Sequence, residues 1–352
     1  MSRTPLLYAL HSGNLYGTER MALATASGLS DRFEPVIFAP AGVALEEATR
    51  QGMRAIPFRG PADFALKLRG YLARHRKIAF FATGIVHSFS CLAWNQLYRR
   101  RIAHLHMVHG GTDELLSYGR KKKLNNRPVE FVAVSAFVRD RLIANGVVGE
   151  QIRVVENFLS PQAAASAPKR ELFTAGGVRR VILVSRVDPI KRLDLLLDVL
   201  DRGSCPDGMT FRIFGTGWHL EQLRARAAAR HPNVRFEGFR GDLGHEIAAS
   251  DLLVHTCPVE PFGLAILEAM AAGVPVLVPD AGGAGDLVTE CVTGFRFRAN
   301  DASHLGERLQ ELAVASATTL NRVTEAARAA LESRFSARRG IAEYSRLLEG
   351  ML

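Results

Sequence analysis

Cysteine is scarce in this sequence of 352 residues, and the four cysteines stand far apart. They are Cys91, Cys205, Cys257 and Cys291, and no two of them form a C-x-x-C pair. This spacing fits neither a disulfide framework nor a cysteine-rich zinc motif. We therefore interpret them as reduced thiols that pack as small hydrophobic side chains.

The sequence also lacks any stretch of about 18 consecutive apolar residues. The N-terminal apolar run, 6–10, is too short for a signal peptide or a membrane-spanning helix. Hydrophobic residues make up 47% of the chain and charged residues 23%, which is typical of a globular protein of this length with two domains. We expect a cytoplasmic protein, with peripheral association at the inner face of the plasma membrane as a further expectation.

Acidic residues are few in the first half of the chain only. Residues 1–165 contain 22 Lys and Arg against 12 Asp and Glu, whereas residues 166–352 contain 23 of each. The net charge of +10 therefore belongs to the first half, with clusters at 67–77, 99–101 and 120–123. A solvated basic surface would explain it, and so would an anionic membrane, where each Lys or Arg contributes about 1 kcal/mol. A nucleic-acid partner is disfavoured because aromatic residues are only 8% and form no stacking stripe.

Strand-like and helix-like segments alternate along the chain. Short, almost continuously apolar runs are typical of strands buried on both faces, and amphipathic stretches separate them. The expected strands are 6–10, 35–39, 84–88, 105–109, 130–135, 180–185, 210–215, 233–238, 251–256, 274–279 and 294–298, and the expected helices include 17–29, 193–200, 219–230 and 264–272. This order predicts an α/β protein with doubly wound parallel sheets.

A segment rich in Ala, Ser, Pro and Gly, 157–177, has no helical or strand period and is typical of a connection between domains. We predict a Rossmann-like N-terminal domain of residues 1–160 and a Rossmann-like C-terminal domain of residues 161–334, facing a central cleft. The tail, about 335–352, has apolar residues at helical spacing. It predicts a final helix that crosses back to the N-terminal domain.

Two glutamates, Glu260 and Glu268, flank the start of an apolar helix. Gly263 would let a ligand approach the backbone closely, and a helix N-terminus attracts anions through its free N–H groups and partial positive charge. Glu260 is placed to accept hydrogen bonds from sugar hydroxyls, and Glu268 to accept hydrogen bonds from the hydroxyls of a ribose. The alternative, a cap and a surface residue, is disfavoured because an unpaired carboxylate on a buried helix is costly.

Arg186 and Lys191 follow the strand expected at 180–185, at the edge where open α/β sheets bind their ligands. Two cations there can hold a diphosphate and stabilise the charge of a leaving group. Ordinary surface cations are the alternative.

The first half offers its own candidates. Gly13 and Gly17 flank a loop that suits the close approach of a ligand, although a tight turn would look similar. Arg20 is placed either to face a phosphate or to pair near Glu19. His109 ends an expected strand, and no carboxylate lies at a spacing that would complete a metal site with it. We expect no metal and no cofactor.

The stretch EPFGLAILEAMAAGVPV resembles the Glu-seven-residues-Glu signature of the retaining glycosyltransferases of family four, which have the two-domain GT-B fold. LVSRVDPIKRLDLLLDVL (183–200) resembles the basic donor-phosphate segment of that family, and FRIFGTG (211–217) resembles its glycine turn near the nucleotide. FEGF (236–239) resembles the next strand end, and GNLYGTERMALATASGL (13–29) resembles the first loop and helix. The similarity covers essentially the whole chain.

The resemblance implies transfer of a sugar, with retention, from a nucleotide-diphosphate sugar to an acceptor hydroxyl, with a UDP-sugar favoured over a GDP-sugar. The residues implied are Glu260, His109, Arg186 and Lys191 for catalysis, Glu268, Phe262, Gly263, Leu264, Gly215 and Gly217 for the donor, and Gly13, Tyr16, Gly17 and Arg20 for the acceptor side. Two departures stand out. Tyr16 precedes Gly17 where the family has adjacent glycines, and Arg192 follows Lys191 where many members have Gly.

Several alternatives stay open. The basic first half suggests an acceptor at a membrane, such as a lipid-linked saccharide or a lipopolysaccharide precursor, and a small soluble acceptor is the alternative. The rival activity is that of a GT-B-fold sugar-nucleotide epimerase, which would convert the donor with no acceptor present. The sequence contains no G-x-G-x-x-G at a strand-to-helix turn and no P-loop, which disfavours dinucleotide oxidoreductases and P-loop enzymes.

Overall fold

The computed structural model describes residues 3–111, 114–161, 163 and 168–352. The chain divides into two compact units. Unit 1 comprises Met1–Ser160 together with Ala337–Leu352, and unit 2 comprises Pro161–Ser336. From the sequence we expect these boundaries after residue 160 and at about residue 334.

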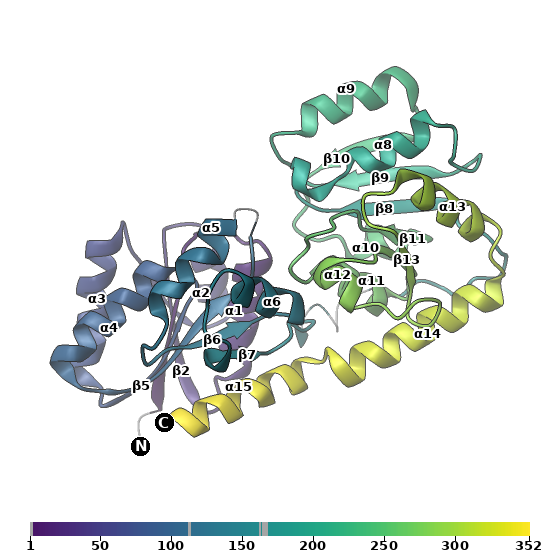
Figure 1. Cartoon of the computed structure of the whole chain (residues 1–352). Helices are drawn as coiled ribbons and strands as arrows, with labels where there is room; N and C mark the ends of the chain where they lie inside the picture. The colour runs from purple at the N-terminus through teal and green to yellow at the C-terminus, as the bar shows by residue number, and fades with distance from the viewer. Residues whose placement is uncertain (1–2, 112–113, 162, 164–167) are drawn as a thin grey trace. The chain divides into compact units, whose positions relative to one another are not determined.

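Unit 1 is built on a parallel sheet of seven strands (Figure 1). Their order is β3 (Arg54–Pro57), β2 (Phe33–Ala39), β1 (Thr4–Ala9), β4 (Lys77–Ala82), β5 (Arg101–Val108), β6 (Glu130–Ala133) and β7 (Ile152–Val154). The order reverses between β1 and β4. This reversal is a topological switch point, and open α/β sheets bind ligands at the carboxyl ends of the strands beside it.

Helices cover both faces of the unit 1 sheet. Alternate strand residues face opposite sides, so Leu7 and Phe80 lie in the core under α3 (Pro61–Arg74) and α4 (Ile85–Tyr98), while Tyr8 and Phe81 face the other side. There the ring of Phe81 contacts the rings of Tyr8 and of Tyr344 on α15 (Ala337–Met351). The other helical segments of the unit are α1 (Gly17–Gly28), α2 (Val43–Arg50), α5 (Glu114–Ser117), η1 (Gly119–Leu124), α6 (Ala136–Ala144) and η2 (Gly149–Gln151).

Unit 2 repeats this architecture with six parallel strands. Their order is β10 (Val234–Gly238), β9 (Thr210–Phe214), β8 (Arg180–Val184), β11 (Leu252–Val254), β12 (Val276–Pro279) and β13 (Phe295–Phe297). Its helical segments are η3 (Pro189–Lys191), α8 (Asp194–Asp201), α9 (Leu220–Arg230), α10 (Gly244–Ala248), α11 (Leu264–Ala272), α12 (Gly282–Asp286), α13 (Ala302–Ala313) and α14 (Ala317–Arg334). The switch point lies between β8 and β11, in the strand order of dinucleotide-binding domains.

The expected strand at 84–88 is wrong. The strand of this region is β4, which ends at Ala82, and Gly84 precedes helix α4 (Ile85–Tyr98). The apolar, β-branched start of that helix imitates a buried strand, because its first turn also packs into the core at His87 and Ser88. Strands β3 and β7 were not expected, since they have only four and three residues and stand at the two edges of the sheet.

The tail forms α15, and it packs on unit 1 through small residues. A Cβ atom added at Gly340 would lie 2.2 Å from Cδ1 of Phe158, a side chain in the core of unit 1. A Cβ atom added at Gly28 of α1 would lie 2.5 Å from Cδ1 of Ile341 on α15. Among the described residues no helix has the length and apolar character needed to cross a membrane.

Replacing Gly340 with Ala should therefore destabilise unit 1, although Ala is the better helix former. The forced shift of Phe158 costs about 1–3 kcal/mol, which exceeds the propensity gain of about 1 kcal/mol. We expect a lower midpoint in urea unfolding followed by circular dichroism. The matched control is Gly350→Ala on the same helix, where an added Cβ meets nothing within 4 Å. Equal midpoints for the two variants would contradict the packing described above.

Candidate functional site

Two loops meet at the switch point of unit 2. One follows β8 and leads to η3, and the other follows β11 and leads to α11. The hydroxyl of Thr256 donates to the carbonyl of Lys191 at 2.7 Å, and the thiol of Cys257 donates to the carbonyl of Ile190 at 3.3 Å. The residues expected to hold the diphosphate and the sugar are thus brought together by hydrogen bonds from side chains of one loop to backbone carbonyls of the other.

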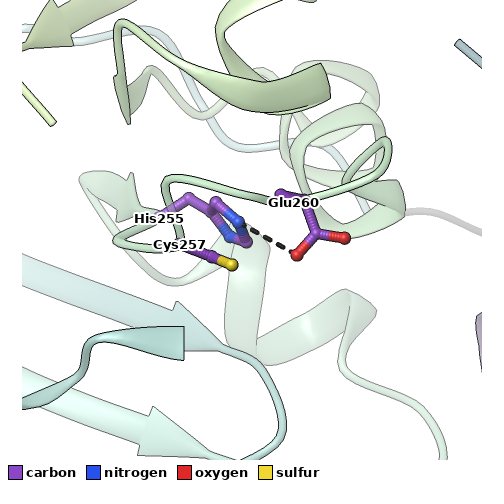
Figure 2. A group of neighbouring side chains, drawn as sticks. All are labelled: His255, Cys257 and Glu260. Carbon is purple, nitrogen blue, oxygen red and sulfur yellow. Dashed lines mark ion pairs between the residues drawn. The ribbon is translucent and has the colours of Figure 1, made fainter. Parts of the chain in front are cut away.

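Lys191 and Glu260 form an ion pair at this point. Nζ of Lys191 donates to Oε2 of Glu260 at 2.6 Å, and each side chain is only 14% exposed. Figure 2 shows His255 turned toward the same carboxylate, with Nε2 lying 3.2 Å from Oε2. That approach lacks the geometry of a hydrogen bond, so Nε2 of His255 is buried with no hydrogen-bond partner in the described part of the chain. Glu260 therefore stands between two cationic side chains.

The charges of this cluster support one another. Burial opposes ionisation of Glu260, but Lys191 and His255 outweigh it and hold the pKa of the carboxyl well below its usual range. Burial lowers the pKa of His255, but Cys257 and Glu260 outweigh that effect and raise it to about 9. The pKa of Lys191 is raised in the same way, against burial, chiefly by Glu260. At neutral pH these three side chains carry two positive charges and one negative charge.

His255 and Cys257 were missed as site residues, because each was weighed without its neighbours. Their ligand atoms and a carboxylate oxygen of Glu260 lie within 4.8 Å of one another, as the donors of a zinc site would (Figure 2). The ammonium of Lys191 already lies against that carboxylate, and it would repel a divalent cation. We infer that the ammonium of Lys191, in place of a metal ion, supplies the positive charge next to these three side chains. The spacing His-x-Cys-x-x-Glu is the signal that could have found the cluster.

Arg186 lies beside the cluster, since its charge acts on the pKa of Lys191. Its side chain is half exposed, and its Nη1 lies 3.0 Å from Oδ2 of Asp188. Gly215 and Gly217, expected to contact the donor, have a packing role: an added Cβ would lie 1.8 Å from the carbonyl oxygen of Ser185 at the first and 2.2 Å from that of Val187 at the second. The glycine turn thus packs tightly on the loop that carries Arg186.

Helix α11 begins at Leu264, and Gly263 precedes it with φ +103°, a conformation that favours glycine. Glu268 lies on this helix and is partly buried. The side chain of Phe262 is buried and packs edge-to-face on Phe335, so it belongs to the core. Gly283, which was not expected to matter, donates its N–H to the carbonyl of Glu260 at 2.7 Å and fixes the backbone there.

The candidates of the first half lie in unit 1. His109 follows β5, and within the described residues its Nε2 is buried without a hydrogen-bond partner. Burial, with help from His11, lowers the pKa of His109 to about 4. Gly13 is explained by packing, because an added Cβ would lie 2.6 Å from the carbonyl oxygen of Pro40.

Helix α1 begins at Gly17, and Tyr16 stands before it. The backbone N–H of Tyr16 donates to Glu19 at 3.1 Å, and its ring is exposed. The charge of Arg20 is among those that lower the pKa of Glu47. The expected contact of Arg20 with a phosphate stays a prediction.

Known families match both units. Residues 16–163 match the family described as Glycosyltransferase Family 4, and residues 168–330 match Glycosyl transferases group 1. The chain belongs to glycosyltransferase family 4. Together the two matches extend from α1 to α14 of this family-4 chain.

Curated relatives of the family-4 chain include mannosyltransferases. A GDP-mannose-dependent alpha-mannosyltransferase of Mycobacterium tuberculosis is 32% identical over 197 residues, which are 53% of this chain and 50% of that protein. A phosphatidyl-myo-inositol mannosyltransferase of Mycobacterium leprae is 30% identical over 170 residues, 47% of this chain and 45% of that protein. The chain spans about half the length of the curated relatives it matches.

Solved structures match over the whole length. Anabaena HepE in complex with UDP-glucose has a TM-score of 0.81 at 20% identity, covering 99% of this chain and 100% of that chain. The lipopolysaccharide outer core galactosyltransferase WaaB in its apo form has a TM-score of 0.73 at 14% identity, covering 99% and 100%. These likenesses confirm the expected GT-B fold of the family-4 chain.

The cluster around Glu260 makes a prediction about pH. Folding raises the pKa of His255 from 6.5 to about 9, so the protonated ring stabilises unit 2. This contribution is fully present below pH 6.5 and is lost as the pH rises through about 9. We expect His255→Gln to lower the free energy of unfolding by roughly 1–3 kcal/mol at about pH 6 and by much less at about pH 9.5. Urea unfolding at both pH values measures this.

The control for this prediction is the exposed His245, whose replacement by Gln should give the same small effect at both pH values. A cost for His255→Gln that does not change with pH would mean that His255 is neutral in the folded protein.

Proposed function

We propose that this protein is a retaining, metal-independent glycosyltransferase that moves a hexose from a nucleotide-diphosphate sugar to an acceptor hydroxyl. One observation carries the proposal: the surplus positive charge of Lys191, Glu260 and His255 at the switch point of unit 2. A diphosphate is the group that such a site would attract at the carboxyl edge of an α/β sheet.

The donor we propose is GDP-mannose, with UDP-sugars as the alternative. The sequence by itself favoured UDP. The names of several relatives that are 30–35% identical specify GDP-mannose, and they outweigh the UDP complexes of structures that are only 20% identical.

Each site residue has a role in this reaction. Lys191 and Arg186 hold the diphosphate and stabilise its charge as the sugar leaves. Glu260, kept ionised by its neighbours, accepts hydrogen bonds from hydroxyls of the sugar, and Glu268 accepts hydrogen bonds from hydroxyls of the ribose. The acceptor hydroxyl attacks from the face that the diphosphate leaves, and a phosphate oxygen takes its proton.

We place the acceptor at an anionic membrane. Unit 1 contains 25 Lys and Arg against 14 Asp and Glu, whereas unit 2 contains 20 against 21. Helices α3 and α4 also expose Leu66 and Leu97 near basic residues such as Arg69 and Arg99. Exposed apolar and basic side chains together are typical of surfaces that bind anionic lipid. The lipid-linked acceptor in the name of the M. leprae relative is consistent with this.

Removing Lys191 should abolish most of the transfer. We expect Lys191→Met to lower kcat/KM by about two to three orders of magnitude, the usual cost of losing a group that stabilises charge in the transition state. The control is Lys169→Met, the other lysine of unit 2, which is exposed and should stay within about twofold. Release of GDP from GDP-mannose and formation of product measure the two variants. Conversion of the donor into an isomer with no acceptor present would instead support an epimerase.

Nucleotide binding tests the donor site separately. Calorimetry with GDP and UDP should give tight binding for one of them, and Glu268→Ala should weaken it by about tenfold or more, since two hydroxyl contacts are lost. Binding that Glu268→Ala leaves unchanged would remove Glu268 from the site. No binding of either nucleotide would contradict the proposed function as a whole.

Vesicle binding tests the acceptor side. Replacing Arg74, Arg76 and Arg99 with Gln should weaken binding to vesicles with about 30% anionic lipid and reduce its salt dependence. The control replaces three exposed arginines of unit 2, Arg224, Arg230 and Arg235, in the same way. Equal binding to neutral vesicles would overturn the electrostatic argument.

A further inference from the structure

Unit 1 has a switch point of its own, between β1 and β4, and basic side chains gather there. The register of the sheet sets Ala9 of β1, Ala82 of β4 and His106 of β5 at the same level. Just beyond that level the backbone N–H of His11 donates to the hydroxyl of Thr83 at 3.0 Å, and Nδ1 of His11 lies 2.8 Å from the same hydroxyl. These contacts span the switch point.

One side chain of the group is exposed and two are buried. His11 is exposed, whereas His87 is 6% and Lys121 9% exposed. Gly84 lies between the two histidines: a Cβ added there would lie 3.0 Å from Nδ1 of His87 and 3.5 Å from Cβ of His11. The absence of a side chain at Gly84 therefore leaves His87 facing the loop that carries His11.

Two buried ring nitrogens near this switch point have no hydrogen-bond partner among the described residues. Nδ1 of His87 and Nε2 of His109 are both buried without a hydrogen bond in the described part of the chain. A buried polar atom that makes no hydrogen bond costs about 1–3 kcal/mol. The ammonium of Lys121 donates to the carbonyl of Leu116 at 2.8 Å, which uses one of its three donors. The group thus has several polar atoms ready for a ligand.

The charges acting on the group are positive. Burial lowers the pKa of His87 to about 4, and His11 adds to that effect. Burial lowers the pKa of Lys121 to about 8, and Arg120 adds to it. Lys121 in turn lowers the pKa of His11, after burial. Most pKa values here are lowered by burial and by neighbouring cations, an arrangement that a bound anion would relieve.

We propose that His11, His87, His109 and Lys121 form a binding site in unit 1 for an anionic oxygen group of the acceptor, a phosphate or a carboxylate. Lys121 supplies the charge. An anion favours the protonated imidazoles of His87 and His109, whose second N–H groups then donate to it. The claim that the anionic group belongs to the acceptor rests on the proposed function. The anion site itself is independent of that function.

A neutral sugar is the weaker alternative. Hydroxyls could form hydrogen bonds with the two ring nitrogens, but they would not offset the free-energy cost of burying the charged ammonium of Lys121. His106 also has a buried ring nitrogen, Nε2, without a hydrogen-bond partner among the described residues. It differs in its position, because it lies within β5 rather than beyond the end of the strand, and its Nδ1 lies 2.8 Å from the hydroxyl of Ser88.

The test is a titration of the full chain with inorganic phosphate, with saturating GDP present to occupy the proposed donor site. The ring signals of the histidines are followed by NMR and assigned with single His→Gln variants. We expect phosphate to shift the signals of His11, His87 and His109, and Lys121→Met to weaken its binding by about tenfold or more. Lys122→Met is the matched control, since Lys122 is the exposed neighbour on the same η1 turn and should change binding by less than about twofold.

Other probes define the ligand. Glucuronate should bind like phosphate if a carboxylate is accepted, and glucose should not bind. Glycerol 3-phosphate against vesicles of phosphatidic acid distinguishes a soluble phosphate from a lipid headgroup. If Lys121→Met proves unfolded by circular dichroism, His11→Asn replaces it in the experiment. His11 is exposed, and its loss should also weaken the binding of phosphate.

Two results would overturn the inference: no shift of these signals by phosphate, or equal weakening by Lys121→Met and Lys122→Met. Failure of the proposed function would look different. In that case GDP and UDP would show no binding by calorimetry while phosphate still shifted the histidines of unit 1.

Discussion

The ion pair between Lys191 and Glu260 is the contact on which the arrangement of unit 2 depends. It joins the loop after β8 to the loop before α11, two segments 69 residues apart in the chain. Taking two charges out of water costs more than their attraction returns unless further polar groups share the site. Here His255, the hydroxyl of Thr256, the thiol of Cys257 and the N–H of Gly283 supply that support. Such an arrangement contributes little to stability, and its value lies in holding one carboxylate and two cations in fixed positions.

The two units use the same topology for different electrostatic purposes. Unit 2 is nearly neutral overall and has at its switch point a small cluster with two cations and one carboxylate. Unit 1 is strongly basic, and at its switch point it keeps imidazoles whose pKa values lie far below their usual range. The parallel sheet explains why both places are suited to ligands: several strands end at one edge, and the loops that follow them have no neighbouring strand to pair with.

Sequence patterns predicted the parts of this protein that depend on local spacing. Buried strands such as β8 and β12 and the tail helix follow from runs of apolar residues, and the pair Glu260 and Glu268 follows from a signature over a few residues. Contacts between distant segments have no such pattern. The approach of His255 to Glu260 depends on how one loop folds back, and the tight packing at Gly215 depends on the loop that follows β8. The strand expected at 84–88 was wrong because an apolar start of a buried helix has the same composition as a strand.

The division of the chain has a consequence for how the protein folds during synthesis. Unit 1 takes its last helix, α15, from the end of the chain, whereas unit 2 is one continuous segment, Pro161–Ser336. As the chain leaves the ribosome, residues 1–160 emerge first and yet lack the helix that covers Tyr8 and Phe81. Unit 2 is complete before unit 1 can be. The apolar face that α15 covers therefore stays exposed for as long as the 176 residues of unit 2 take to be made, and it is there that a chaperone would act on the nascent protein.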